Sequence, residues 1–418
     1  MNKIRVLWLS NKVQTNWKDV VSGGWLDSMA QGLISSGKIS LGNISAGKAT
    51  RVTRQDYDQI SQWVVPSTAR ACAHGLPKKS IVEDIIRAVK EFSPDLIHVW
   101  GTEFFWGLLT ARKIINEPAL LAMQGVKGAI AKVFHGGLTF SEQLACIGIK
   151  EILRRSTIFH ERKQFQNWEP YEREIITGHR FITTQTVWVT AVVQSNNSDC
   201  QLFHNERPLR AEFYIADQWQ NFQSKNIFCS VAYSSPFKGL HIAIRALAIL
   251  KKKVPTAKLH IGGSHQRPGI RKDGYVAWLN REAERLGVKS DVVWLGPLTA
   301  SQTIKEMQFA AATVIPSFIE SNSILMQEAM MVGIPVVASF VGGMSTIAKN
   351  EDTALYFPPG DDFLCAYQLA RLLTDSLLAE RLSLGARATV FARNNREHIV
   401  ERQIDIYRQV LDRVRGGR

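Results

Sequence analysis

The sequence predicts an α/β protein with two doubly wound, mostly parallel sheets. Short apolar runs alternate with amphipathic stretches in both halves of the chain, and this alternation is typical of parallel sheets covered by helices on both faces. The length of 418 residues suits more than one domain. Apolar residues make up 45% of the chain and charged residues 21%, which is typical of a folded globular protein rather than a disordered one.

In the first half, the expected strands are short and rich in Ile, Val, Leu and Phe, as buried parallel strands are. They lie at residues 4–9, 96–100, 119–123 and 180–184. Between the first two, residues 81–92 place Ile81, Ile85 and Val89 on one face of an amphipathic helix. Pro94 ends that helix before the next strand begins.

The second half repeats the pattern more regularly. We expect strands at 227–233, 258–262, 292–295, 313–316 and 335–339, and helices at 240–253, 276–286, 300–311, 323–331 and 366–373. The polar stretch 216–226 predicts the boundary between an N-terminal domain at 1–215 and a C-terminal domain at 226–394. A last helix, at 395–418, is expected to cross back to the N-terminal domain.

The charge and the cysteines restrict the setting in which the protein works. Lys and Arg number 51 against 37 Asp and Glu, a net charge of +14 that indicates an anionic partner: nucleic acid, a phosphorylated molecule or an acidic membrane surface. The five cysteines form no CxxC pair, which excludes a disulfide framework and a simple cysteine-ligated zinc site. The N-terminus lacks the long apolar core of a signal peptide, and no apolar run approaches about 18 residues, so we expect a cytoplasmic protein without a membrane span.

Residues 312–343 form the most informative segment. A predicted strand ends near residue 316, a loop carries Glu320, and Ser323 can cap the next helix, which carries Glu328. Ligands bind at the C-terminal ends of parallel strands, and free N–H groups at a helix start attract phosphate. Taken singly, the two glutamates are also compatible with solvated acids near a helix start, where the helix dipole alone favours them.

The order of residues in this segment carries a family resemblance. Glu320 and Glu328 are spaced as E-x7-E and are followed by A-M-x-x-G-x-P-V-V-A-S and a G-G pair. This pattern resembles the signature of the family 4 retaining glycosyltransferases (glycosyl transferases group 1), which adopt the GT-B fold of two Rossmann-like domains facing an interdomain cleft. The stretches SVAYSSPFKG, LHIGG and VWLGPL extend the resemblance, and Gly23-Gly24 and DLIHVWG extend it weakly into the N-terminal half. It covers most of residues 1–410.

The resemblance implies roles for individual residues. Lys238 would neutralise the donor diphosphate, Glu328 would bind the ribose hydroxyls, and Glu320 would hold and orient the donor sugar. Gln124 stands where a number of relatives place a His near the reacting sugar, so we expect it to contact substrate. The implied catalytic residues are Glu320, Lys238 and Gln124. The implied donor-binding residues are Gly23, Gly24, Lys238, Glu320, Ser323, Ile324, Leu325 and Glu328. Because a fixed cation and N–H dipoles stabilise the leaving group and no DxD pair is placed to bind a metal, we expect neither metal nor cofactor.

The activity implied by the resemblance is retaining transfer of a sugar from a nucleotide-diphosphate-sugar to an acceptor hydroxyl. The implied setting is surface or exopolysaccharide biosynthesis on a sugar or lipid-linked glycan acceptor at the cytoplasmic face of a membrane. Peripheral attraction to an anionic membrane would then account for much of the positive charge.

The sequence departs from the family pattern at Gln124 and at Tyr233, and the second departure leaves alternatives open. Tyr233 stands where many members carry an Arg five residues before the Lys, and Arg271 or Lys272 would have to supply that charge instead. A catalytically inactive GT-B binding or scaffold protein is therefore the alternative function. His98, at a predicted strand end, is either a catalytic group or a satisfied core residue.

Two further function classes find little support in the sequence. A nucleic-acid-binding protein is indicated only by the charge, since no helix-turn-helix, zinc-finger or RNP-like motif occurs. A nucleotide-sugar epimerase of the same fold is disfavoured because the E-x7-E pattern belongs with transferases.

Overall fold

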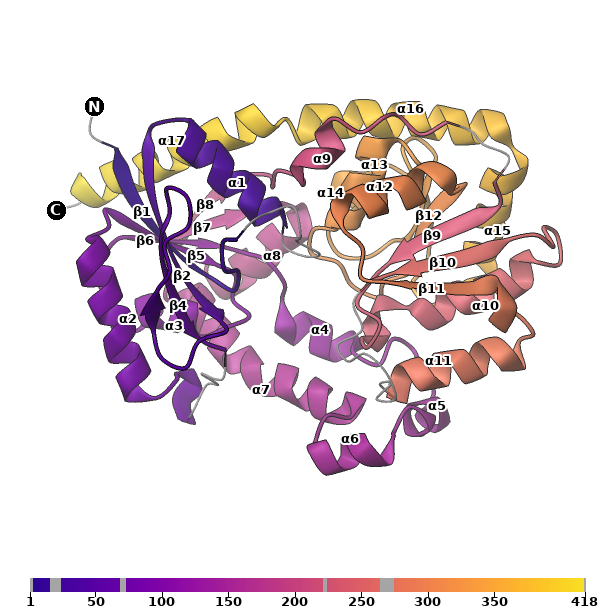
Figure 1. The fold of residues 1–418 in the computed structure, drawn as a ribbon, viewed down its shortest axis with the longest axis horizontal. Helices are drawn as coiled ribbons and strands as arrows, with labels where there is room; N and C mark the ends of the chain where they lie inside the picture. The colour runs from indigo at the N-terminus through magenta and orange to yellow at the C-terminus, as the bar shows by residue number, and fades with distance from the viewer. Residues whose placement is uncertain (1–2, 16–23, 68–72, 221–223, 264–273, 417–418) are drawn as a thin grey trace. The chain divides into compact units, whose positions relative to one another are not determined.

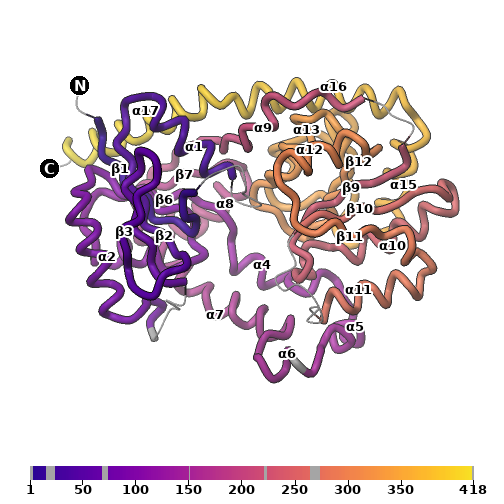
Figure 2. The backbone as a smooth tube through the Cα atoms, in the orientation of Figure 1, coloured from indigo at the N-terminus to yellow at the C-terminus, as the bar shows by residue number. Residues whose placement is uncertain are grey.

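The computed structural model describes residues 3–15, 24–67, 73–220, 224–263 and 274–416. The chain forms two compact units, shown in Figures 1 and 2. Unit 1 contains residues 1–127, 168–210 and 394–418, and unit 2 contains residues 128–167 and 211–393. Each unit is an α/β structure built on a largely parallel sheet, so the predicted fold class is confirmed.

Unit 1 is built on a single sheet. Its strands are β1 (Ile4–Ser10), β2 (Ile39–Gly47), β3 (Thr53–Arg54), β4 (Ser61–Pro66), β5 (Leu96–Trp100), β6 (Ala119–Ala122), β7 (Phe181–Thr184) and β8 (Gln201–His204). Their order in the sheet is β3-β4-β2-β1-β5-β6-β7-β8. The pairs are parallel except for β3 with β4, which is antiparallel. In the central pairing, Val6 of β1 lies opposite Leu96 of β5.

Helices connect and cover these strands. They are α1 (Gly24–Ser35), η2 (Ala73–Gly75), α2 (Lys79–Phe92), α3 (Trp106–Ala111), α8 (Val187–Asn196) and α17 (Arg396–Arg415), together with the C-terminal part of α7 (Ile158–Thr177). The sequence predicted α2 over 81–92 and α17 over 395–418. The latter packs inside unit 1, against α1.

Strand β2 was missed from the sequence because it is polar where a buried strand is usually apolar. Asn43 lies in its centre, fully buried. Its side chain accepts a hydrogen bond from Ser10 Oγ at 2.9 Å and donates to Gln62 Oε1 at 2.9 Å and to the Lys12 carbonyl at 2.9 Å. Burial of this amide is tolerated because its bonding capacity is met, and the partners come from positions up to 33 residues away.

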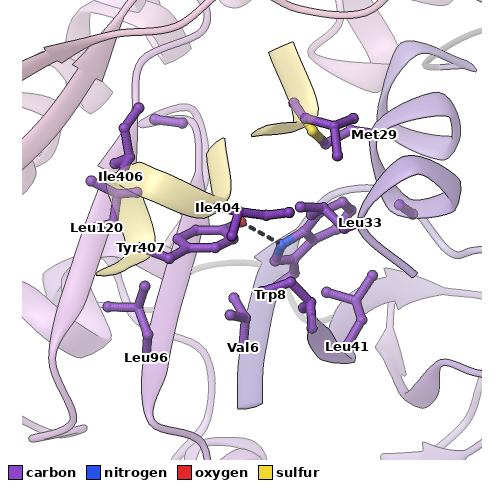
Figure 3. Packing of buried hydrophobic residues seen from close by; sticks show 14 of the residues in the cluster. Val6, Trp8, Met29, Leu33, Leu41, Leu96, Leu120, Ile404, Ile406 and Tyr407 are labelled. Carbon is purple, nitrogen blue, oxygen red and sulfur yellow. Dashed lines mark hydrogen bonds between the residues drawn. The ribbon is translucent and has the colours of Figure 1, made fainter. Parts of the chain in front are cut away.

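The core of unit 1 joins the two ends of the chain. Figure 3 shows α17 residues such as Ile404 and Tyr407 packed beside Trp8 of β1. Trp8 Nε1 donates to the Tyr407 hydroxyl at 3.3 Å, and His98 Nδ1 lies 2.7 Å from the same oxygen. His98 is fully buried within this core. The structure therefore supports the core interpretation of His98 rather than a catalytic one.

Unit 2 is built on a second parallel sheet. Its strands are β9 (Asn226–Ser230), β10 (Lys258–Gly262), β11 (Val292–Gly296), β12 (Ala312–Ile315), β13 (Val336–Ser339) and β14 (Leu355–Phe357). Their order is β11-β10-β9-β12-β13-β14, and every pair is parallel. The five strands predicted in this half are all present, while β14 was missed. With three residues, β14 is too short to give a periodic signal.

The helices of unit 2 come from both sides of the predicted boundary at 216–226. They are α4 (Lys127–Val133), α5 (Phe140–Ala145), α6 (Ile149–Arg154), the start of α7, α9 (Ala211–Tyr214), η3 (Pro236–Lys238), α10 (Leu240–Leu250), α11 (Gly274–Arg285), η4 (Lys289–Asp291), α12 (Ala300–Phe309), α13 (Ile324–Val332), α14 (Met344–Ile347), α15 (Asp362–Thr374) and α16 (Ser376–Arg393). Within unit 2, α10 packs against α15, and α13 packs against α16.

Residues 128–167 join unit 2 through specific polar bonds. His241 of α10 is fully buried and its Nε2 lies 2.8 Å from the Gly136 carbonyl, while Arg245 on the same helix forms an ion pair with Glu142. Such long-range bonds leave no trace in local sequence patterns. Among the helices that the structure describes, none has the length and apolar composition required to cross a membrane.

Three buried histidines make stability depend on pH. Burial lowers the pKa of His98 to about 3 and those of His179 and His241 to about 4, below the ordinary value of 6.5. Between pH 6.5 and about 4 the unfolded chain binds protons that the folded chain does not, so stability falls as pH falls. Each histidine removes about 1.4 kcal/mol per pH unit in that range. We expect calorimetry to give a lower unfolding temperature at about pH 5 than at about pH 7.5.

The matched variants are His241→Gln and, at an exposed position, His398→Gln. The first should reduce the pH dependence of the unfolding temperature of its unit, and the second should leave it unchanged. An unfolding temperature that stays constant across this range would contradict the assignment.

Candidate functional site

The loop between β12 and α13 carries the first glutamate of the sequence motif. Glu320 lies in this loop, after the C-terminal end of a parallel strand, which is where open α/β sheets bind ligands. Ser317 Oγ donates a hydrogen bond to Glu320 Oε1 at 2.7 Å. The Ser317 carbonyl in turn accepts from the hydroxyl of Ser339, at the end of β13. The loop is thus bonded to the next strand of the sheet.

Lys238 and Glu320 form an ion pair. Lys238 Nζ lies 2.7 Å from Glu320 Oε1. The lysine side chain is 25% exposed and the glutamate side chain 14% exposed, so both are shielded yet reachable from solvent. Glu320 Oε2 has no hydrogen-bond partner among the residues that the structure describes. The structure therefore brings together the two residues that the sequence proposed as catalytic within this half.

A glycine allows the loop that carries Lys238 to come close to the loop that carries Glu320. Gly239 adopts φ +73°, and a Cβ atom there would lie 1.9 Å from the Pro316 carbonyl oxygen. Beside it, the Phe318 N–H donates to the Phe237 carbonyl at 2.7 Å. A side chain at position 239 would push the loop that carries Lys238 away from the loop that carries Glu320.

The glycine pair of the motif supports Glu320 from the other side. The Gly343 N–H donates to the Glu320 carbonyl at 2.8 Å. Gly342 adopts φ +50°, and a Cβ atom there would lie 2.2 Å from the same carbonyl oxygen. The pair that ends the sequence signature therefore fixes the backbone of the residue that begins it.

The N-terminus of α13 presents free backbone donors. The side chain of Ser323 caps the helix by accepting from the Met326 N–H at 3.3 Å, which confirms the predicted cap. Among the described residues, none accepts a hydrogen bond from the N–H groups of Ile324 and Leu325. Together with the positive end of the helix dipole, these donors suit an anion such as phosphate.

Glu328 lies further along the same helix and is only 4% exposed. The next turn of α13 is equally buried, with Met330 and Met331 fully covered. Only a small part of its surface is therefore accessible to solvent.

Tyr233 is a structural residue rather than a ligand. Its hydroxyl donates to the Ile261 carbonyl at 2.8 Å and accepts from the Gly296 N–H at 3.1 Å, so it links β10 to β11. The side chain is fully buried, and burial raises the pKa of the phenol to about 12. It supplies no positive charge to the site. Arg271 and Lys272, the sequence candidates for that charge, lie outside the described residues, as does Gly23.

Unit 1 contains the other predicted site residues. Gly24 is the first residue of α1, and a Cβ atom there would lie 2.8 Å from Cγ of Arg210. Gln124 follows β6 and is half-buried. Its side-chain carbonyl carbon lies 3.4 Å from the position that a Cβ atom on Gly101, directly after β5, would occupy. Gln124 is thus located at the C-terminal edge of this sheet.

Glu103 is a candidate that sequence reasoning missed. It lies at the ends of β5 and β6, where its Oε1 accepts from the Gly125 N–H. Its Oε2 is buried and has no hydrogen-bond partner among the residues that the structure describes. Burial raises the pKa of this carboxyl. Close by in the same unit, Arg207 donates to the Met123 carbonyl at 2.6 Å, and burial lowers the pKa of that arginine to about 10. The only feature of the sequence that could have indicated Glu103 is its position three residues after the predicted strand at 96–100.

No group of three or more His, Cys, Asp or Glu within the described ranges is arranged to hold a metal ion. The charged groups described above at the two sites are a lysine, an arginine and three glutamates, namely Lys238, Arg207, Glu103, Glu320 and Glu328. These groups can bind anionic and hydroxyl-bearing ligands.

Comparison with known proteins gives a family for part of the chain. Residues 214–389 match the family described as glycosyl transferases group 1, which confirms the predicted resemblance. An uncharacterized glycosyltransferase of Methanocaldococcus jannaschii is 30% identical over 175 residues, 42% of this chain and 43% of that protein. D-inositol 3-phosphate glycosyltransferase of Corynebacterium glutamicum is 32% identical over 160 residues, 38% of this chain and 37% of that protein. The chain thus matches these curated relatives over 37% to 43% of their length.

Solved structures match nearly the whole chain. Sucrose-phosphate synthase from Thermosynechococcus elongatus has a TM-score of 0.72 at 17% identity, covering 98% of this chain and 100% of that one. Anabaena HepE in complex with UDP and glucose has a TM-score of 0.66 at 16% identity, covering 96% and 98%. At these identities the likeness shows the fold, which is the GT-B fold that the sequence predicted.

The close approach at Gly239 can be measured against a matched glycine. Gly239→Ala and Gly287→Ala place alanine at the same φ of +73°, but nothing lies within 4 Å of a Cβ at position 287. In both variants the free energy of unfolding should fall by about 1 kcal/mol through backbone strain. In Gly239→Ala it should fall by roughly 1–3 kcal/mol more, because the new methyl group overpacks the site. Denaturant unfolding measures the difference. Equal losses would mean that the contact with Pro316 contributes nothing.

Proposed function

We propose, because residues 214–389 match the family described as glycosyl transferases group 1, that the chain is a retaining glycosyltransferase that uses a nucleotide-diphosphate-sugar donor. The observation that carries the proposal is the Lys238–Glu320 pair, placed just before the free N–H groups of Ile324 and Leu325. A cation and a helix N-terminus on one side of a shielded carboxylate suit a ligand that has both phosphates and hydroxyls.

The leaving group determines what the cation does. When the bond between the anomeric carbon and the phosphate oxygen breaks, negative charge develops on the nucleoside diphosphate. Lys238 and the α13 N–H groups stabilise this charge more in the transition state than in the ground state, and only such differential stabilisation accelerates the step. The donor needs no metal in this arrangement, and activity that persists in EDTA is the expected result.

Glu320 has two tasks in this proposal. Its Oε1 is occupied by Lys238 and Ser317, which fix the carboxylate, while Oε2 remains able to accept a hydroxyl of the donor sugar. The diphosphate then shares the lysine with Glu320. Glu328, further along α13, accepts the ribose hydroxyls from its buried position. Because Anabaena HepE has been solved in complex with UDP and glucose and with UDP-glucose, UDP-sugars are the donors to test first.

The acceptor is assigned to unit 1. Gln124, Glu103 and Arg207 provide neutral, acidic and basic hydrogen-bonding groups at the C-terminal edge of its sheet. Such a mixed set suits sugar hydroxyls. We assign the acceptor to a sugar or lipid-linked glycan in surface or exopolysaccharide biosynthesis, with the enzyme on the cytoplasmic face of a membrane.

A catalytically inactive binding or scaffold protein is the second candidate, and Tyr233 favours it. That side chain is fixed between two strands and carries no positive charge. Lys238 is the cation that pairs with Glu320 in the part of the chain that the structure describes. Release of nucleotide from a panel of nucleotide-sugars, followed by mass spectrometry, separates the two candidates. Turnover of any donor supports the enzyme, and nucleotide binding without turnover supports the scaffold.

Removal of the lysine charge tests the donor site. Lys238→Met should lower the rate of donor turnover by at least about a hundredfold, since a charge-assisted contact to the leaving group contributes roughly 3 kcal/mol or more. Glu320→Gln should lower the rate as well, because the amide cannot pair with Lys238 as a carboxylate does. The measurement is nucleotide release under single-turnover conditions.

A second ion pair in unit 2 supplies the matched control. Lys251 Nζ lies 2.9 Å from Asp291, with side chains 22% and 16% exposed, nearly the values at Lys238 and Glu320. Lys251→Met should leave turnover unchanged while costing a similar amount of stability. If the two lysine variants lose activity equally, the loss reflects a folding defect and not a role in the chemistry.

The acceptor assignment is tested by separating transfer from hydrolysis. Gln124→Ala removes a side-chain hydrogen bond, so transfer to an acceptor sugar should fall about fivefold to tenfold, while hydrolysis of the donor by water should not change. The control is Gln194→Ala at an exposed position of the same unit. An equal fall of transfer and hydrolysis in Gln124→Ala would place this residue in donor binding instead.

A further inference from the structure

Helices α5 and α6 are attached to the rest of unit 2 through polar groups. Glu142 of α5 pairs with Arg245 of α10, and the Ala145 carbonyl at its end accepts from Arg281 of α11 at 2.7 Å. Glu151 of α6 accepts from the Gly274 N–H, at the start of α11, at 2.8 Å. Figures 1 and 2 show both helices beside α11. The two glutamates of these helices and the Ala145 carbonyl therefore attach them to the rest of unit 2.

The apolar side chains of the same helices face solvent. Their exposed fractions lie between 49% and 80%, and they are Phe140, Leu144, Ile149, Ile152 and Leu153. We call this set the α5–α6 surface. The two on α5 are four residues apart, and the three on α6 follow an i, i+3, i+4 pattern, so each set occupies one helix face. Helices of globular proteins usually bury such a face. In α5 and α6 the apolar face is exposed, and glutamates form the bonds to the rest of unit 2.

The charge beside this surface is positive. Arg154 and Arg155 follow directly at the end of α6 and are both exposed. Glu142 and Glu151 are the only acidic residues in 128–160, and both are occupied by bonds to unit 2. The exposed apolar face is thus flanked by two exposed arginines.

We propose that the α5–α6 surface docks onto an anionic lipid membrane. The five apolar side chains enter the boundary between head groups and acyl chains, as those of interfacial helices do. The two arginines remain at the level of the lipid phosphates, to which guanidinium groups bind well. Docking of this kind would bring the enzyme to a lipid-linked acceptor. That role rests on the proposed glycosyl transfer, whereas the membrane contact itself is independent of it.

A second copy of the chain is a less suitable occupant. A twofold interface sets the same patch against itself, and the arginines of two copies would then face like charges that no acid in 128–160 is free to balance. Like charges opposed across an interface cost binding energy. An anionic lipid surface balances the same arginines.

Vesicle sedimentation of the full chain tests the proposal. We expect binding to vesicles of phosphatidylcholine mixed with phosphatidylglycerol, weaker binding to pure phosphatidylcholine, and a decrease as salt is added. The variant Ile149→Ser/Ile152→Ser/Leu153→Ser should bind the mixed vesicles at least tenfold more weakly. Arg154→Gln/Arg155→Asn should lose roughly fivefold per arginine, with Asn used because position 155 has φ +50°.

Matched variants guard against nonspecific effects. Leu377→Ser/Leu384→Ser removes apolar side chains that are 77% and 62% exposed on α16 of the same unit, and it should leave vesicle binding unchanged. Lys252→Gln/Lys253→Gln removes two exposed charges after α10 and should reduce binding far less than the arginine variant. Donor hydrolysis in solution should be the same in the triple serine variant as in the wild type.

The outcomes are distinguishable. Absence of binding to the mixed vesicles, or equal binding by the triple serine variant, overturns the proposal. A wild-type dimer in light scattering that this variant converts to a monomer also overturns it, because the surface then binds a second copy. Vesicle binding without turnover of any donor contradicts the proposed function alone, whereas turnover without vesicle binding contradicts this inference alone.

Discussion

The candidate donor site depends on the close approach of two loops in unit 2. The ion pair between Lys238 and Glu320 forms only because Gly239 lets one backbone pass the Pro316 carbonyl without a side chain between them. Its partner loop is held in place by Gly342 and the following N–H. Two backbone constraints thus position one pair of charges. The chemistry proposed for the site needs that pair to stay fixed, since preorganised charge requires no rearrangement during the reaction.

The sequence could predict the local geometry of this candidate site because most of its parts are close together along the chain. Glu320, the cap at Ser323 and the glycine pair all lie within one strand-loop-helix-strand unit, so local spacing reports their geometry. The lysine lies 82 residues earlier and was found through the resemblance. At the position where the family pattern has an Arg, Tyr233 bonds two strands together and supplies no positive charge.

Prediction failed where structure depends on partners that are distant in sequence. Strand β2 is polar because Asn43 is satisfied by residues of other segments, and an apolar pattern cannot report such bonds. Glu103 was missed for a similar reason: its burial between the ends of two strands, and not its local sequence, makes it unusual. The attachment of residues 128–167 to unit 2 likewise rests on bonds to α10 and α11.

The way the chain crosses between the two units has a consequence for function. It passes from one unit to the other near residues 127, 167, 210 and 393, so neither unit is a continuous piece of sequence. A fragment that starts at 226 would lack the helices of 128–167 and would separate α17 from its core around Trp8. The proposed membrane surface therefore belongs to the same compact unit as the donor site, although it comes from the first half of the sequence. A membrane contact made there would hold unit 2, which contains the proposed donor site, at the lipid surface directly.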